Sequence, residues 1–155
     1  MTALPDIILV PVDGSKGANA AAAYAGTLAE KLGVPVRLLF AFPESAFEMF
    51  GIPSEAPTRE QLKYFSPEAF EELRNDTASA AFKAARDAMS ATGAKAEDKL
   101  LTGDPAKAIL AHAEGAPGCM LVMGRRGLSH FREVLIGSVT QRVLHHATCP
   151  VLVMR

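Results

Sequence analysis

The sequence has no long hydrophobic run. Apolar residues make up 49% of its 155 positions, but no run of them approaches the roughly 20 residues that a membrane-spanning helix needs. The N-terminus also lacks the basic region followed by an apolar one that marks a signal peptide. We therefore expect a cytoplasmic protein with no membrane insertion.

An excess of either charge is missing too. The chain has 16 Lys and Arg against 17 Asp and Glu, and its net charge is -1. The charges are spread along the sequence, with no basic tract that could follow a nucleic-acid backbone. DNA or RNA is therefore not expected as the main ligand.

Cysteine is scarce. The two cysteines, Cys119 and Cys149, each stand beside an apolar run and lack metal-site spacing. Adjacent parallel strands could bring them close together. In a reducing compartment, however, we expect two buried thiols rather than a disulfide.

The two best-known phosphate-binding motifs are absent as well. The nearest approach to a Walker loop is GSKG at residues 14–17, which has neither the spacing nor the order of that motif. The dinucleotide fingerprint Gly-x-Gly-x-x-Gly fails because two residues separate Gly124 from Gly127.

Short apolar runs alternating with amphipathic segments are what the sequence does contain. The run at residues 6–12 does not alternate with polar residues, which fits a strand covered on both faces. Four similar runs follow, and the segments between them have apolar residues at helical spacing. The pattern predicts one α/β domain over residues 1–155: a doubly wound, five-stranded parallel sheet of order 3-2-1-4-5 with helices on both faces.

After the first strand, apolar residues recur at the spacing of a helix: Ala21, Tyr24, Ala25, Leu28 and Leu32. Residues 43–66 form a long proline-containing connection with aromatic residues that look exposed. This connection fits a mobile insertion, a flap beside a ligand or a partner surface. Within it, Thr58 and Gln61 suggest a short capped helical turn.

The most informative stretch is MGRRG at residues 123–127, followed by IGSVT at residues 136–140. The order strand, glycine loop, helix suits a phosphate, because glycine permits close backbone approach and a helix start offers unpaired N–H groups. Ser138 and Gln141 predict a capping box at that helix.

The spacing Gly-x2-Gly-x9-Gly-Ser, at Gly124, Gly127, Gly137 and Ser138, resembles the nucleotide-binding signature of the universal stress protein family, in its ATP-binding branch. GDPA at residues 103–106 also looks like a turn of that family. The resemblance covers nearly the whole chain except the segment after the second strand. It implies a Rossmann-like fold of the adenine nucleotide alpha hydrolase type.

The predicted topology places a ligand crevice at the carboxyl ends of the first and fourth strands. Asp13 follows one of them and Gly124 ends the other. A carboxylate suits a base or sugar, whereas backbone N–H groups and the Ser138 hydroxyl suit phosphates. Other interpretations stay open: Asp13 caps a helix, the glycines are ordinary turn residues, and Arg125 and Arg126 are solvated charges.

The resemblance implies a role for each residue. Pro11, Val12 and Asp13 would border adenine and ribose, and Ala41 would meet the base through its backbone unless a register shift puts Phe40 or Phe42 there. Arg126, just before the second glycine, would approach the phosphates. The expected binding residues are Pro11, Val12, Asp13, Ala41, Met123, Gly124, Arg126, Gly127, Gly137, Ser138, Val139 and Thr140.

A metal ion and catalytic residues remain to be predicted. A triphosphate carries about four negative charges, whereas a helix N-terminus contributes only about 0.3–1 kcal/mol per interacting charge. A magnesium ion is therefore expected with ATP. Catalysis has little support, because the nearby candidates Ser129, His130 and Glu133 have no partners at recognisable spacing, so no catalytic residue is assigned.

The last strand predicts a homodimer. Val151–Met154 is wholly apolar, and after its first residue no charge or proline blocks pairing at the sheet edge.

The expected function is an ATP-binding stress-response regulatory protein. It would act as a nucleotide-dependent homodimeric switch or adaptor for an unknown protein partner. The alternatives are a slow ATP hydrolase or autophosphorylating protein at the same site, and a nucleotide-free interaction module.

Overall fold

The computed structural model describes residues 3–51, 57–128 and 135–155. Its sheet has five parallel strands in the order β3-β2-β1-β4-β5, which confirms the predicted doubly wound topology. The strands are β1 (Ile7–Pro11), β2 (Val36–Phe42), β3 (Ala96–Thr102), β4 (Cys119–Gly124) and β5 (Val151–Met154).

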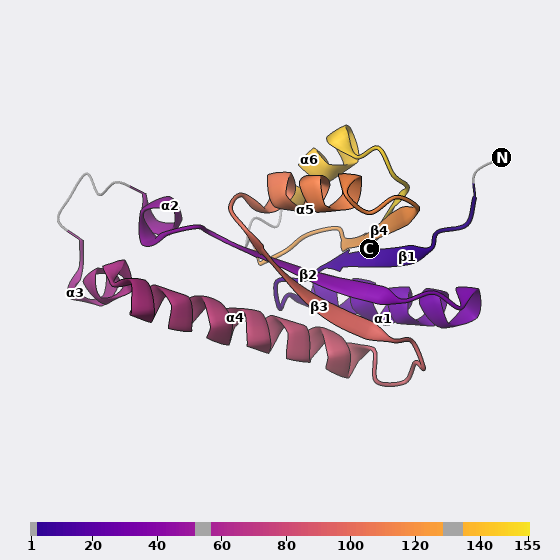
Figure 1. Cartoon of the computed structure of the whole chain (residues 1–155), viewed down its shortest axis with the longest axis horizontal. Coiled ribbons are helices and arrows are strands. Elements are labelled where there is room, and N and C mark those ends of the chain that lie inside the picture. The colour runs from indigo at the N-terminus through magenta and orange to yellow at the C-terminus, as the bar shows by residue number, and fades with distance from the viewer. Residues whose placement is uncertain (1–2, 52–56, 129–134) are drawn as a thin grey trace.

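Helices cover both faces of the sheet (Figure 1). One face carries α1 (Lys16–Leu32) and α4 (Pro67–Ala88), and the other carries α5 (Pro105–Glu114) and α6 (Ser138–His146). Because successive side chains of a strand point to opposite faces, Ile8 packs with the first pair of helices and Leu9 with the second. Within the described ranges, no helix is long and apolar enough to cross a membrane.

The helix starts follow local sequence signals, with one exception. Ser66 and Asp104 cap α4 and α5 as their side chains accept backbone N–H bonds, and a proline follows each cap. The capping box predicted for Ser138 and Gln141 is wrong. Gly137 occupies the cap position of α6 without a side-chain bond, because Ser138 is already the first helical residue.

Helix α1 packs on the sheet through small residues. Ala21, Ala22 and Ala25 are fully buried, whereas Tyr24 is 44% exposed. The helix lies against β1, β4 and α4, close enough that methyl groups fill the space between them. The tyrosine ring lies on the outer side.

The connection at residues 43–66 extends beyond the sheet, next to the start of α4 (Figure 1). Its described parts form α2 (Ala46–Phe50), α3 (Arg59–Leu62) and the 3-10 turn η1 (Lys63–Phe65). The rings of Phe47 and Phe65 pack edge to face with centroids 4.8 Å apart. Thr58 forms the predicted capping box with Gln61.

The two edges of the sheet differ. At β3, the Arg86 guanidinium donates to Asp98 at 2.6 Å and to the backbone carbonyl of Ala96 at 3.2 Å. Charge therefore covers part of that edge, which discourages further strand pairing there. At β5, the side chains are apolar and half-buried. The carbonyls of Met154 and of Pro150, which directly precedes the strand, accept bonds from the N–H groups of Arg125 and Leu121 on the β4 side.

The alanine face of α1 leads to a stability prediction. Ala25→Leu adds three carbons at a fully buried site and should lower the free energy of unfolding by about 1–3 kcal/mol through overpacking. Ala20→Leu, on the exposed side of the same helix, should change it by less than about 0.5 kcal/mol. Urea denaturation measures both, and equal effects would contradict the close packing.

Candidate functional site

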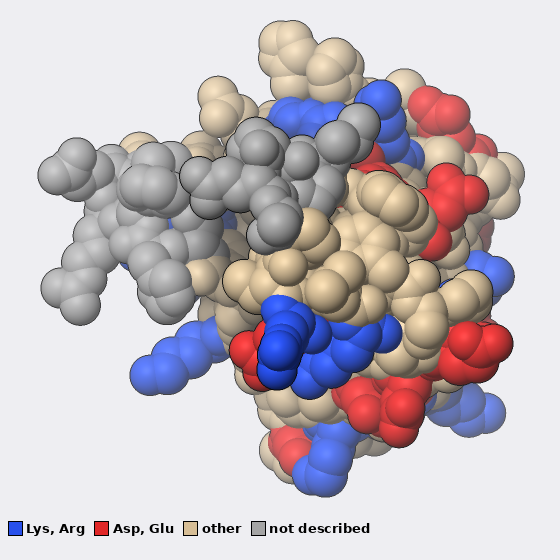
Figure 2. Space-filling view, turned by 90° about the vertical axis from the view of Figure 1, so that its left-hand side faces the viewer, with Lys and Arg blue, Asp and Glu red and all other residues tan. Residues whose placement is uncertain are grey.

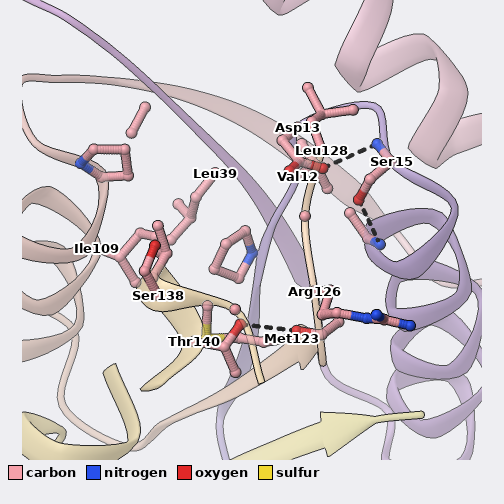
Figure 3. A pocket seen from close by; sticks show the side chains of 18 residues that line it. Val12, Asp13, Ser15, Leu39, Ile109, Met123, Arg126, Leu128, Ser138 and Thr140 are labelled. Atoms are coloured by element: carbon pink, nitrogen blue, oxygen red, sulfur yellow. Dashed lines mark hydrogen bonds between the residues drawn. The ribbon is translucent and has the colours of Figure 1, made fainter. Parts of the chain in front are cut away.

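A cavity of about 230 Å³ opens at the carboxyl ends of β1 and β4 (Figure 3). All twelve residues expected from the sequence line it, although they come from four separate segments of the chain. None of the described residues of the connection at 43–66 lines it, so the structure gives no support to a flap there. The lining residues are Pro11, Val12, Asp13, Ser15, Ala18, Leu39, Ala41, Pro105, Ile109, Met123, Gly124, Arg126, Gly127, Leu128, Gly137, Ser138, Val139 and Thr140.

Asp13 lies between β1 and the start of α1. One oxygen of its carboxylate, Oδ1, accepts the backbone N–H of Ser15 at 2.9 Å. Ser15, not Asp13, caps α1, because its hydroxyl accepts the N–H of Ala18 at 3.2 Å. The other carboxylate oxygen, Oδ2, lies so close to Gly127 that a side chain at position 127 would collide with it. Asp13 and the glycine loop therefore meet, as the sequence predicted.

The glycine loop depends on a close backbone approach to α1. A Cβ atom at Gly124 would lie 2.6 Å from the carbonyl carbon of Gly17, and one at Gly17 would lie 2.7 Å from the carbonyl oxygen of Arg126. Real side chains essentially never tolerate such distances. The two glycines therefore let the first turn of α1 rest on the main chain that follows β4.

Main-chain bonds connect the loop to two other elements. The N–H of Arg125 donates to the carbonyl of Met154 in β5 at 2.8 Å, and the carbonyl of Arg125 accepts the N–H of Gly137 at 2.8 Å. The Thr140 hydroxyl of α6 donates to the Gly124 carbonyl at 2.9 Å. The end of β4, the start of α6 and the edge strand β5 are thus bonded through residues 124 and 125.

The side chains divide the cavity into two parts (Figure 3). Leu39, Ile109 and Met123 give one part an apolar wall, and Asp13 lies across the cavity from them. The Arg126 side chain extends toward α1 and away from these apolar residues. Its backbone, rather than its guanidinium, faces Gly137, since a Cβ at Gly137 would lie 3.3 Å from the Arg126 Cα.

An ion pair joins the two helices that flank the apolar part. Asp104 caps α5 by accepting the N–H of Lys107 at 3.0 Å, and its second oxygen accepts from Arg142 of α6 at 2.9 Å. The hydrogen bond from Arg142, followed by that from the Lys107 backbone, lowers the pKa of the Asp104 carboxyl. The carboxylate therefore stays charged and holds the N-terminus of α5 near α6.

Six lining residues were not predicted: Ser15, Ala18, Leu39, Pro105, Ile109 and Leu128. Two of them had a signal in the sequence, because Pro105 belongs to the GDPA turn at residues 103–106 and Ser15 lies shortly after Asp13 at a helix start. Leu39 and Ile109 had none, since an apolar residue of a strand or helix can equally belong to the closed core.

Metal-binding and catalytic groups receive no support from the described residues. Among them, no group of three or more His, Cys, Asp or Glu side chains gathers tightly enough to hold a metal ion. The three candidates named for catalysis, Ser129, His130 and Glu133, lie outside the described residues.

Surface charge is mixed on the face shown in Figure 2. Lys and Arg side chains alternate there with Asp and Glu, and among the described residues no continuous basic stripe crosses it. This view agrees with the net charge of -1.

The comparisons with known proteins agree on one family. The model of the Universal stress protein family matches residues 5–155. A universal stress protein of Thermus aquaticus is 35% identical over 149 residues, which cover 96% of this chain and 97% of the relative.

Solved structures extend the comparison. A universal stress protein in complex with cAMP has 25% sequence identity and a TM-score of 0.68, with 99% of each chain covered. The universal stress protein from Archaeoglobus fulgidus in complex with dAMP has 25% identity and a TM-score of 0.59, with 100% of each chain covered. Both of these similar proteins hold an adenine nucleotide.

The contact between Gly17 and Gly124 generates a prediction. Gly124→Ala forces α1 away from β4 and should lower the free energy of unfolding by about 1–3 kcal/mol. Gly115→Ala is the control, because φ there is −79° and its nearest atom would be 3.6 Å away. That variant should unfold within about 0.5 kcal/mol of the parent. Thermal unfolding followed by circular dichroism compares them, and an unperturbed Gly124→Ala would rule out the backbone contact.

Proposed function

This chain belongs to the universal stress protein family, and from that premise we propose that it is an ATP-binding stress-response regulatory protein. It works as a nucleotide-dependent homodimeric switch or adaptor for another protein. One observation carries the proposal: a single cavity brings the Asp13 carboxylate together with Gly124, Gly127 and Gly137.

The two parts of the cavity suit the two ends of a nucleotide. Adenine packs against the apolar wall of Leu39 and Ile109, and the backbone at Ala41 recognises its edge. Asp13 accepts hydrogen bonds from the ribose hydroxyls. The cavity, at about 230 Å³, is smaller than the roughly 300–1,000 Å³ typical of small-molecule sites. The phosphates therefore extend along the glycine loop toward solvent.

The phosphate end uses backbone donors. The first N–H groups of α6, at Ser138 and Val139, have no partners inside their own helix and attract an anion. The Ser138 hydroxyl adds a further donor. Magnesium accompanies ATP, because the partial charge at the start of α6 is small against the roughly four negative charges of a triphosphate. Its ligands are mostly phosphate oxygens and water, in keeping with the preference of Mg²⁺ for oxygen.

The route from nucleotide to dimer passes through the main chain of Arg125. This residue bonds both to Gly137 at the phosphate end and to Met154 in the edge strand. Nucleotide that orders the glycine loop therefore also orders the end of β5. We place the homodimer contact on that edge, with Val151–Met154 pairing antiparallel to its copy across a two-fold axis.

The first prediction concerns affinity. Asp13→Ala removes a charged acceptor and should weaken ATP binding roughly 10–100-fold, because a hydrogen bond to a charged group contributes about 1.5–3 kcal/mol. Asp6→Ala is the matched control, since Asp6 carries an exposed carboxylate at the opposite end of β1. The affinity of the Asp6→Ala variant for ATP should stay within about twofold of that of the parent. Isothermal titration calorimetry with ATP and magnesium measures both.

Two further measurements separate the alternatives. Mass spectrometry of the purified protein identifies any nucleotide that it carries, and labelled ATP reveals hydrolysis or autophosphorylation. An empty protein with no measurable affinity for ATP would leave the interaction module as the better description. Turnover lost in Asp13→Ala would favour the slow enzyme.

A second prediction concerns the dimer. Pro150 and Met154 bond toward β4. Alternate residues of a strand bond to opposite sides, so Val153 turns its N–H outward. Val153→Pro removes that donor without breaking the ladder to β4, and should yield monomers at micromolar concentrations where the parent and Val153→Ala are dimers. Analytical ultracentrifugation measures the state, and circular dichroism checks the fold. A dimeric Val153→Pro variant would place the interface elsewhere.

A further inference from the structure

The two cysteines lie opposite each other at the far end of the sheet from the cavity. Cys119 is the first residue of β4, and Cys149 precedes β5 by two residues. Leu121 is paired with Val151 in the β4–β5 register, so extending that register back by two residues places Cys119 opposite Cys149. Both belong to the apolar cluster beneath α5 and α6.

The thiols also touch. Both cysteines are free, Cys119 is buried and Cys149 is half-buried. Burial, followed by the hydrogen bond with Cys149, raises the pKa of Cys119 to about 11. The Cys119 thiol also donates to the Ala113 carbonyl at 3.5 Å. Residues opposite each other on neighbouring strands have Cα atoms about 5 Å apart, which lies within the span that a disulfide bridges.

We propose that Cys119 and Cys149 form a reversible intramolecular disulfide when the protein meets a hydroperoxide. The half-buried Cys149 thiolate attacks the peroxide, takes up one oxygen as a sulfenic acid and releases water or an alcohol. The Cys119 sulfur then attacks the Cys149 sulfur, and the sulfenic oxygen leaves as water with the Cys119 proton. The two thiols lose two electrons and two protons, and the peroxide is reduced by the same two electrons.

The bond would enclose the glycine loop covalently. The chain between the two cysteines contains the end of β4, the glycine loop and all of α6. Closing a loop of about 30 residues restricts the unfolded chain and stabilises the fold. The nucleotide cavity lies at the opposite end of β4, so the disulfide leaves it open. The proposal therefore stands or falls independently of nucleotide binding.

The test treats the full-length protein with hydrogen peroxide and follows thiol content, peptide mass and melting temperature. We expect loss of both thiols, a peptide linking Cys119 to Cys149 in the monomeric chain on a non-reducing gel, and a rise in melting temperature of about 5–15 °C. Dithiothreitol should restore the parent values.

Two variants keep the result interpretable. Cys149→Ser, at the half-buried position, should fold normally and show no rise after peroxide. Cys119→Ala leaves a small apolar residue at the buried position and should accumulate Cys149 sulfenic acid, which dimedone traps. The proposal is overturned if the oxidised parent carries Cys149 sulfinic acid beside a free Cys119, forms only intermolecular disulfides, or melts at the same temperature as the reduced protein.

Discussion

The contact of two main chains, at Gly17 in α1 and Gly124 at the end of β4, fixes the arrangement around the cavity. Neither position can carry a side chain without meeting the backbone of the other segment or of Arg126. Because the helix rests directly on the loop, the residue that precedes it, Asp13, reaches Gly127. A carboxylate and a set of backbone donors, distant in the sequence, thereby face one space.

The sheet around this contact is asymmetric in a way that bears on assembly. At β3, Arg86 covers the edge by bonding to Asp98 and to the Ala96 carbonyl. At β5, no charged side chain stands among the four strand residues, and their apolar side chains are half-buried. Among the described residues, the β5 edge is bonded to the glycine loop through the N–H of Arg125 and the carbonyl of Met154. A change in the loop on ligand binding would therefore reach β5 directly, through this hydrogen bond.

The sequence predicted the strand order from local signals, and its resemblance to a known family implied twelve of the eighteen residues that line the cavity. Unbroken apolar runs mark buried parallel strands, and glycine spacing marks a close backbone approach. It failed where neighbours in space decide the outcome. Tyr24 has the same helical spacing as Ala21 and Ala25, but its side chain is 44% exposed whereas theirs are fully buried. Gly17 belongs to a fragment that matches no motif, and its role appears only when Gly124 lies beside it.

Arg125 illustrates how such a link can escape notice. It joins β5 to α6 through its own N–H and carbonyl, which all residues except proline share. Sequence drift at this position can therefore leave the connection intact, and a survey by alanine replacement would pass over it. Related chains with a different residue at this position can keep the same two main-chain hydrogen bonds. The identity of residue 125 is therefore a poor guide to its importance.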